Sequence, residues 1–388
     1  MAVPDPTALD RGLARTGRLH GLDLLRAVAS LAVLYVHLSA WFRYHGGPTT
    51  LTDWLNQWLV EPAHFNQDFG FLGVALFFLV SGFVISAVAM RETVGEFAIK
   101  RTVRIFPPLA VAVLLAWVLV ITGHYRVPGG DGGVGVPDLL MSSVLANFFV
   151  PGNAALVGVA WTLVIQLAIY AMVCALLPVY RREPWLVIGI EITVCAVVLS
   201  VVRHFEGLPN STIANIGAFG TAVVLGQVVW AVWARRLPLW AGAGLGLSCW
   251  IVFLWGDALG YGRYDDSYPL TLCVALLIMM MAVLAEEHIR PHRVVTWLSS
   301  RSYSTYLLHQ TVIFSVLAAT ASWNRWLAGA LALGCTFVVV EILYRTVERP
   351  IGRLTSALAR RARERRHPPA APPAGPDSVE PATSGAPG

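Results

Sequence analysis

Residues 22–42 read LDLLRAVASLAVLYVHLSAWF, an apolar run that is long enough to cross a bilayer as a helix. Arg26 and His37 interrupt this run in an Arg-x10-His pattern. On a helix the two side chains differ by only about 20° around the axis and stand roughly 16 Å apart along it. Because an ionisable residue inside a membrane is costly unless it is paired or used, this pair is the first candidate functional feature.

The composition of the whole chain excludes an ordinary soluble domain. Of its 388 residues, 56% are hydrophobic and only 13% are charged, whereas soluble domains have about 25% charged residues. We therefore expect an all-α, polytopic membrane helix bundle with about ten transmembrane helices. Apolar windows of about twenty residues predict spans near residues 22–42, 69–90, 105–123, 157–178, 185–203, 213–233, 238–255, 269–287, 303–321 and 327–346.

The basic residues predict how the bundle is oriented. Of the 28 Lys and Arg residues, 22 fall in segments that this layout places in the cytoplasm, five fall in outer segments, and Arg26 lies in the first span. Cytoplasmic loops typically carry such an excess, so both termini are expected in the cytoplasm and the protein in the plasma membrane. The net charge of +5 suits contact with anionic lipid headgroups and requires no nucleic acid. The oligomeric state is not predicted.

Composition divides the chain into three parts. Residues 1–21 form a cytoplasmic tail, residues 22–348 the ten-helix membrane domain, and residues 349–388 a basic and then Pro, Ala and Gly-rich tail that is expected to be disordered. No metal site is expected, because the five cysteines lack ligand spacing and Pro291 interrupts the helical spacing of His288 and His292.

Six stretches of the chain resemble the membrane acyltransferase-3 family. The resemblance covers roughly residues 18–350, and Arg26-x10-His37 and Arg101-x-x-Arg104 are its most specific elements. It implies transfer of an acyl group, often acetyl, from acyl-CoA to a hydroxyl on a sugar or a sugar-bearing acceptor, with acyl-CoA as substrate and no resident cofactor. The stretches are RLHGLDLLRAVASLAVLYVH (18–37), FLGVALFFLVSGFVIS (71–86), KRTVRIFPPL (100–109), WTLVIQLAIY (161–170), RSYSTYLLH (301–309) and VERP (347–350).

The ionisable residues of the first span suit this chemistry. A hydroxyl that attacks a thioester must lose its proton, and a neutral imidazole is the usual acceptor, so His37 is the candidate general base. Arg26 lies near the cytoplasmic end of the span, where its guanidinium suits a phosphate or the thioester-bearing arm of the donor. Asp23 precedes Arg26 by three residues and is placed to orient that guanidinium. A structural pair inside the bundle is the alternative for Arg26 and His37.

Three further residues are candidates for substrate binding, mainly through the resemblance. Arg101 and Arg104 lie one turn apart at the cytoplasmic end of the third span, where they suit a polyphosphate. An ordinary positive-inside anchor is the alternative for them. His309 matches a family histidine, and either a substrate contact or a structural hydrogen bond accounts for it.

One position departs from the family pattern. Members commonly carry Trp-Ser-Leu and then a glutamate, whereas here the Trp-Thr-Leu that begins at Trp161 is followed by Gln166. A glutamine cannot polarise a histidine as a carboxylate can, so another acid is expected to support the base. The candidates for that role are Asp68, Glu341 and Glu348.

A membrane transporter is the main alternative function, because intramembrane Arg, His and Glu residues also mark proton or substrate paths. The sequence has no recognisable internal repeat, which argues against that alternative. We therefore expect an O-acyltransferase. Its acceptor is a cell-envelope glycan, a glycolipid or a macrolide-type metabolite, and the sequence does not choose among them.

Overall fold

The computed structural model describes residues 19–366 except 46, 48, 67–68, 128–132, 151, 205–209 and 262–266. Every regular element in this part of the chain is a helix, and it contains no strand, which confirms the predicted all-α class. In chain order the α-helices are α2 (His20–Tyr44), α3 (Thr50–Leu55), α4 (Gly70–Ala89), α5 (Val94–Ile121), α6 (Val136–Ser143), α7 (Trp161–Ala175), α8 (Leu177–Arg182), α9 (Pro184–His204), α10 (Asn210–Trp233), α11 (Leu239–Ala258), α12 (Tyr268–Leu284), α13 (Arg293–Ser300), α14 (Ser302–Ala319), α15 (Arg325–Leu343) and α16 (Arg349–Arg366).

Each of the ten predicted spans coincides with a helix of the structure. Among the described residues, eight helices are long and apolar enough to cross a membrane, which supports a multi-pass membrane protein. Of the remaining two, α12 is shorter, with 17 residues, and α14 carries many polar side chains along its first half. The count of ten spans and the cytoplasmic position of both termini therefore stay predictions.

Two segments differ from the sequence prediction. The prediction starts the third span near residue 105, but α5 begins at Val94, where Thr93 and Glu96 form a capping box that satisfies the first backbone N–H groups. Arg101 and Arg104 therefore lie inside the helix. Residues 349–366, which the prediction groups with the tail, form α16. This stretch is rich in Arg and also carries Ala and Leu, all of which favour a helix. Residues 367–388 lie outside the described residues.

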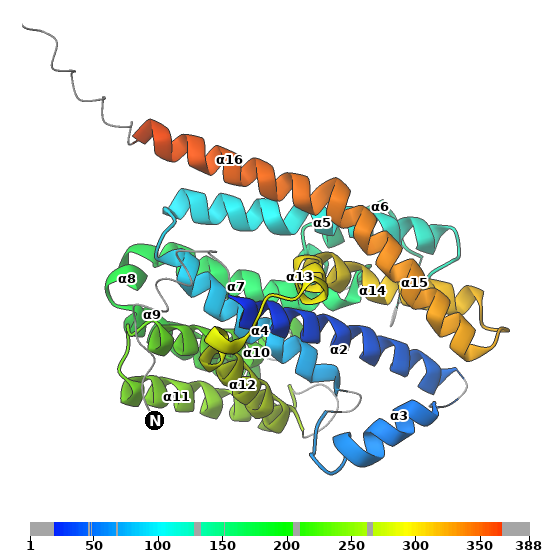
Figure 1. Cartoon of the computed structure of the whole chain (residues 1–388), viewed down its shortest axis with the longest axis horizontal. Coiled ribbons are helices and arrows are strands. Elements are labelled where there is room, and N and C mark those ends of the chain that lie inside the picture. Colours follow the sequence, from blue (N-terminus) through cyan, green and yellow to red (C-terminus); the bar gives the residue numbers. More distant parts are fainter. Residues whose placement is uncertain are drawn as a thin grey trace, which may run out of the picture.

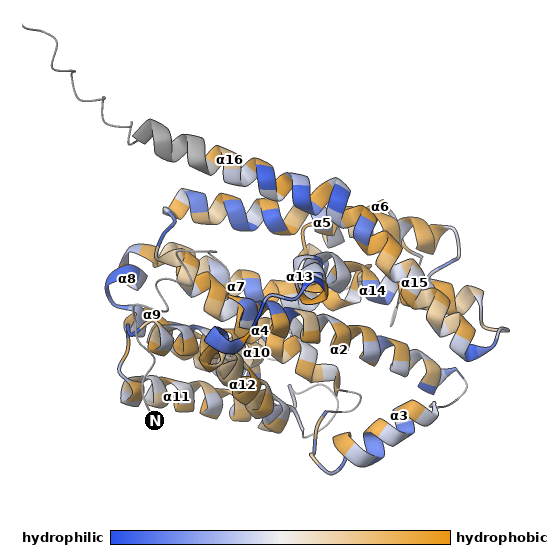
Figure 2. Ribbon diagram, viewed as in Figure 1, coloured by the Kyte–Doolittle hydropathy of each residue, from blue (hydrophilic) through white to orange (hydrophobic). Residues whose placement is uncertain are grey.

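The helices pack around α4, which lies beside α2 in the middle of the bundle (Figure 1). α10 packs against α4, α7, α9 and α11, and the largest cluster of buried apolar side chains lies among these helices. A second cluster joins α5, α7, α14 and α15. Figure 2 shows apolar residues along most helices and a concentration of hydrophilic residues on α16 and the neighbouring half of α5.

Close contact between α4 and α10 depends on two glycines. A Cβ atom at Gly82 would lie 1.8 Å from the carbonyl oxygen of Val223, and one at Gly226 would lie 2.0 Å from that of Leu79. Helices in membranes commonly associate through such small residues, because two backbones can then approach closely. This contact fixes the face of α4 that carries Ser81, the residue before Gly82, relative to the rest of the bundle.

We predict that Gly226→Ala destabilises the protein by about 1–3 kcal/mol, because the added methyl group must push two backbones apart. Gly334→Ala on α15 is the matched control. Nothing lies within 4 Å of a Cβ atom at that position, and alanine favours a helix over glycine by about 0.5–1 kcal/mol. Thermal unfolding in one detergent compares the variants. A melting temperature of Gly226→Ala equal to that of wild type would contradict the close contact.

Candidate functional site

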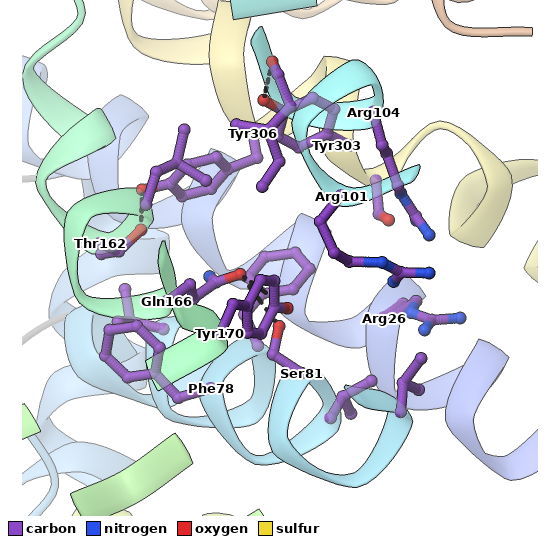
Figure 3. A pocket seen from close by; sticks show the side chains of 17 residues that line it. Arg26, Phe78, Ser81, Arg101, Arg104, Thr162, Gln166, Tyr170, Tyr303 and Tyr306 are labelled. Carbon is purple, nitrogen blue, oxygen red and sulfur yellow. Dashed lines mark hydrogen bonds between the residues drawn. The ribbon is translucent and has the colours of Figure 1, made fainter. Parts of the chain in front are cut away.

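An internal cavity of about 100 Å³ lies where α2, α4, α5, α7 and α14 meet (Figure 3). Three arginines from α2 and α5 line one end of it. Ser81 on α4 and Gln166 on α7 contribute polar groups to its wall, and Tyr303 and Tyr306 of α14 contribute aromatic rings. Apolar side chains, mostly from α4, form the remaining wall. The cavity therefore has a cationic end and a polar interior within a bundle that is otherwise apolar.

The cationic end brings together three of the predicted site residues. The guanidinium groups of Arg26, Arg101 and Arg104 gather on one side of the cavity (Figure 3). The Arg26 guanidinium lies 3.7 Å from the carboxylate of Asp23, and Asp23 is buried and accepts a hydrogen bond of 2.6 Å from the Ser299 hydroxyl. Asp23 is therefore held on both sides and is placed to orient Arg26.

The charge on α5 is only partly neutralised. Glu92 forms an ion pair of 2.6 Å with Lys100 and a longer one of 3.8 Å with Arg101. The Nε atom of Arg101 is buried and has no hydrogen-bond partner among the described residues. Arg104 has no recorded ion pair in that part of the chain. The single carboxylate of Glu92 thus neutralises only part of the charge of two cations. The remaining positive charge suits an anionic ligand.

Gln166 lies at the centre of the polar wall. Its Oε1 atom accepts a hydrogen bond of 3.1 Å from the Ser81 hydroxyl and a longer one of 3.5 Å from the Tyr170 hydroxyl. A carboxylate at this position would accept the same two hydrogen bonds. With Oε1 occupied in this way, the amide nitrogen of Gln166 stays available to donate to a ligand in the cavity.

The rings of His37 on α2 and His309 on α14 pack against each other, tilted by 55° and with their centroids 4.8 Å apart. His309 is fully buried, and its Nδ1 atom lies 3.0 Å from the carbonyl oxygen of Thr305 and 2.8 Å from that of Tyr306. Since a carbonyl oxygen only accepts, Nδ1 must carry the proton and donate it. The Nε2 atom then holds the lone pair, and it is buried without a partner in the described structure.

The structure does not place His37 in the wall of the cavity that Arg26 lines. The cavity and the pair of histidines adjoin at Tyr306. This residue lines the cavity, and its ring centroid lies 6.1 Å from that of His309, which is one turn further along α14. The Tyr306 hydroxyl is 2.5 Å from the Thr162 hydroxyl and donates to the Val159 carbonyl. Tyr306 therefore separates the cationic cavity from the two histidines.

The other predicted site residues either lie away from the two histidines or fall outside the part of the chain that the structure describes. Trp161 packs its ring against Phe78 and Phe219 in the apolar core, at centroid distances of 6.3 and 5.3 Å. Asp68 lies outside the described residues. Glu348 accepts a hydrogen bond of 2.5 Å from Ser304.

Glu341 is held by two arginines rather than by a histidine. It accepts hydrogen bonds from Nη2 of Arg301, at 2.9 Å, and from Nε of the same residue. Arg345 adds another hydrogen bond of 2.5 Å. The Arg301 guanidinium also lies over the rings of Trp297 and Tyr344, 4.7 and 4.2 Å from their centroids. No contact between Glu341 and His37 is recorded, so the structure provides no support for Glu341 as the acid that assists the base.

Sequence reasoning missed a buried acid in the membrane. Glu191 on α9 is fully buried and accepts a hydrogen bond of 2.6 Å from the amide of Gln227 on α10. It lies inside the predicted span 185–203, so an acidic residue within an apolar window was the available signal. Neither residue lines either cavity, and the pair joins α9 to α10.

A second, outer cavity of about 790 Å³ adjoins the first. Arg101 and Arg104 line both cavities, so these two side chains form the boundary between them. The outer cavity lies between α5 and α16, and its volume falls in the range of about 300–1,000 Å³ that is common for ligand sites. Sequence reasoning missed it, because α16 follows the last apolar span. Among the described residues no group of three or more His, Cys, Asp and Glu side chains is placed to hold a metal ion.

Comparison with known proteins finds similarity to acyltransferases. The family model described as "Acyltransferase domain" matches residues 19–345. Nodulation protein 10 of Rhizobium leguminosarum bv. viciae is 26% identical over 379 residues, which cover 89% of this chain and 97% of that protein. Acyltransferase MdmB of Streptomyces mycarofaciens is 27% identical over 384 residues, which cover 88% of this chain and 93% of that protein.

A more distant relative, the peptidoglycan O-acetyltransferase OatA of Listeria monocytogenes, is 22% identical over 371 residues. The match covers 85% of this chain but only 55% of that protein. No solved structure matches the chain.

We predict that Glu341→Gln lowers the free energy of unfolding by about 1–2 kcal/mol, because Arg301 loses its charged partner in a partly buried setting. Arg345→Ala is the control, since its side chain is 68% exposed and exposed ion pairs contribute about 0–1 kcal/mol. Thermal unfolding measures both variants. If Glu341→Gln were as stable as wild type but inactive, Glu341 would belong to the reaction site instead.

Proposed function

The chain belongs to the acyltransferase-3 family and is therefore an acyltransferase, and from that premise we propose that acetyl-CoA donates its acetyl group to a hydroxyl of a carbohydrate or glycosylated acceptor. The acceptor is a cell-envelope glycan, a glycolipid or a macrolide-type metabolite, and the reaction takes place at the plasma membrane. Similarity to OatA, a protein named as a peptidoglycan O-acetyltransferase, supports transfer of an acetyl group to a glycan.

The observation that carries the proposal is the cationic boundary between the two cavities. Arg101 and Arg104 line both cavities, and Arg26 lies beside them at the same end of the inner one. Guanidinium groups bind phosphate oxygens through paired hydrogen bonds and stay charged at any physiological pH. We assign this boundary to the phosphorylated donor, whose nucleotide end stays in the outer cavity while its thioester arm passes between the arginines.

The size of the inner cavity supports a short acyl group. A volume of about 100 Å³ is well below the range of about 300–1,000 Å³ that is common for sites of larger ligands. A two-carbon acyl group with its thioester is of that size, whereas a long fatty acyl chain would require the surrounding helices to separate. Acetyl is therefore the acyl group that we propose.

Gln166 is suited to stabilise the reacting carbonyl. Attack on a thioester places negative charge on the carbonyl oxygen, and a fixed N–H donor aimed at that oxygen lowers the barrier. The Oε1 atom of Gln166 is held by Ser81 and Tyr170, so its amide N–H groups are oriented for a ligand. We propose this donor role for Gln166, which a glutamate at this position could not perform when ionised.

His37 is the proposed general base. Its ring is half-buried and packs against His309 and Phe314, at centroid distances of 4.8 and 5.9 Å. The lone pair on Nε2 of His309 can accept an N–H from His37, which would leave the other His37 nitrogen free to take the proton of the acceptor hydroxyl. The Tyr306 ring must shift for the thioester to reach His37, because it lies between the cavity and the histidines.

We predict that His37→Ala abolishes acetylation in cells, because loss of a general base typically slows a reaction by about 10²–10⁴-fold. Mass spectrometry of envelope glycans and secreted metabolites from a deletion strain should show a product that lacks the mass of one acetyl group. Wild type restores that mass, and His37→Ala does not.

His288→Ala is the matched control, because His288 is an exposed histidine that lines neither cavity. It should restore the acetylated product as wild type does. Western blotting of membranes verifies equal amounts of each protein. Full restoration by His37→Ala would exclude His37 as the base.

A further inference from the structure

α16 lies beyond the family match, which ends at residue 345, yet it forms one wall of the outer cavity. In Figure 1 it runs alongside the first half of α5 and continues past the start of that helix. The two helices pack against each other. A segment after the matched acyltransferase domain thus contributes directly to a cavity that Arg101 and Arg104 of that domain also line.

The start of α16 is fixed to the membrane helices. A π-helical turn at Tyr344–Glu348 joins α15 to α16 without a break in the helix, and such wide turns often occur at functional sites. Within this turn, the Tyr344 ring lies under the Arg301 guanidinium, 4.2 Å away, and Glu348 accepts a hydrogen bond from Ser304 of α14. These contacts set which face of α16 points towards α5.

That face presents Arg349 and Arg353 to the outer cavity. The two residues are four positions apart, so they share one side of the helix. Neither has a recorded ion pair among the described residues, and Arg104 opposite them on α5 also has none. Two carboxylates offset part of this charge: Glu92 pairs with Lys100 and Arg101, and Glu348, which accepts a hydrogen bond from Ser304, interacts with the charge of Arg104. Five basic side chains against two carboxylates still leave an excess of positive charge in the lining of the outer cavity.

Like charges that converge on one concave site favour an anion there. The positive side chains come from both walls, so a ligand with more than one phosphate is needed to contact both. The exposed leucines of α16, Leu354 and Leu358, lie about 100–180° around the helix from the two arginines. A lipid surface would meet α16 on that apolar side, whereas the arginines face the cavity.

We propose that Arg349 and Arg353 bind the phosphates at the nucleotide end of the acyl donor and so make α16 a second wall of the donor site. This inference rests on the proposed function, in which the donor is acyl-CoA. Anionic lipid headgroups also carry phosphate, so the experiment must distinguish a bound lipid from the bound acyl donor. α16 then selects for donors that retain their nucleotide over shorter thioesters.

The test measures binding of coenzyme A and of pantetheine, which lacks the nucleotide, to the full-length protein in phosphatidylcholine nanodiscs. Arg349→Ala/Arg353→Ala should bind coenzyme A at least about tenfold more weakly than wild type and bind pantetheine equally well. Arg349→Lys/Arg353→Lys should recover part of the affinity, because the charge is retained. Arg182→Ala/Arg236→Ala removes two exposed arginines that line neither cavity and should bind as wild type does.

Three other outcomes would each contradict a different part of the proposal. If the Ala/Ala variant bound coenzyme A as tightly as wild type, α16 would not be part of the donor site, while the proposed function would stand. If it lost bound anionic lipid in native mass spectrometry with unchanged affinity for coenzyme A, the arginines would bind headgroups instead. If wild type itself bound no coenzyme A, the proposed donor would be wrong and this inference with it.

Discussion

Inside a bilayer no water is available to satisfy a polar side chain, so each such group must be surrounded by protein or line a cavity. α14 illustrates this constraint most clearly. It is the helix whose first half carries the most hydroxyl, amide and imidazole groups, and nearly all of that half is buried between neighbouring helices. Placing α14 in the interior brings Tyr306 to the inner cavity and His309 to His37. The position of both parts of the site therefore follows from where the polar residues can be tolerated.

Much of this arrangement could be predicted from the sequence. Apolar windows located every long helix except α16, and the Arg-x10-His and Arg-x-x-Arg patterns identified three arginines that the structure brings to one cavity. Other features depend on contacts between distant segments and could not be read from local patterns. The start of α5 was missed because its first turns are polar, although the Thr93–Glu96 capping box was a usable signal. α16 was missed because it is rich in arginine and its apolar residues are too few to make an apolar window. Glu341 looked available in the sequence, and only the structure shows that Arg301 and Arg345 hold it.

The separation of Arg26 from His37 gives the proposed reaction a definite geometry. Both lie on α2, but Arg26 lines the inner cavity and His37 packs on His309 beyond Tyr306. A donor that enters between the arginines must therefore displace one aromatic ring before its thioester reaches the base. The Tyr306 hydroxyl is held by Thr162 and a backbone carbonyl, so this displacement has an energetic cost.

The central claim is that one path runs from the outer cavity, between Arg101 and Arg104, past Tyr306 to His37. A cryo-EM structure of the full-length protein with a non-reactive thioether analogue of acetyl-CoA tests it most directly. Such a path predicts nucleotide density between α5 and α16, an acyl end within hydrogen-bonding reach of Gln166, and a Tyr306 ring moved out of its position between the inner cavity and His37. Analogue density in a cavity that contacts none of these residues, or a His37 ring that faces lipid in the complex, would contradict it.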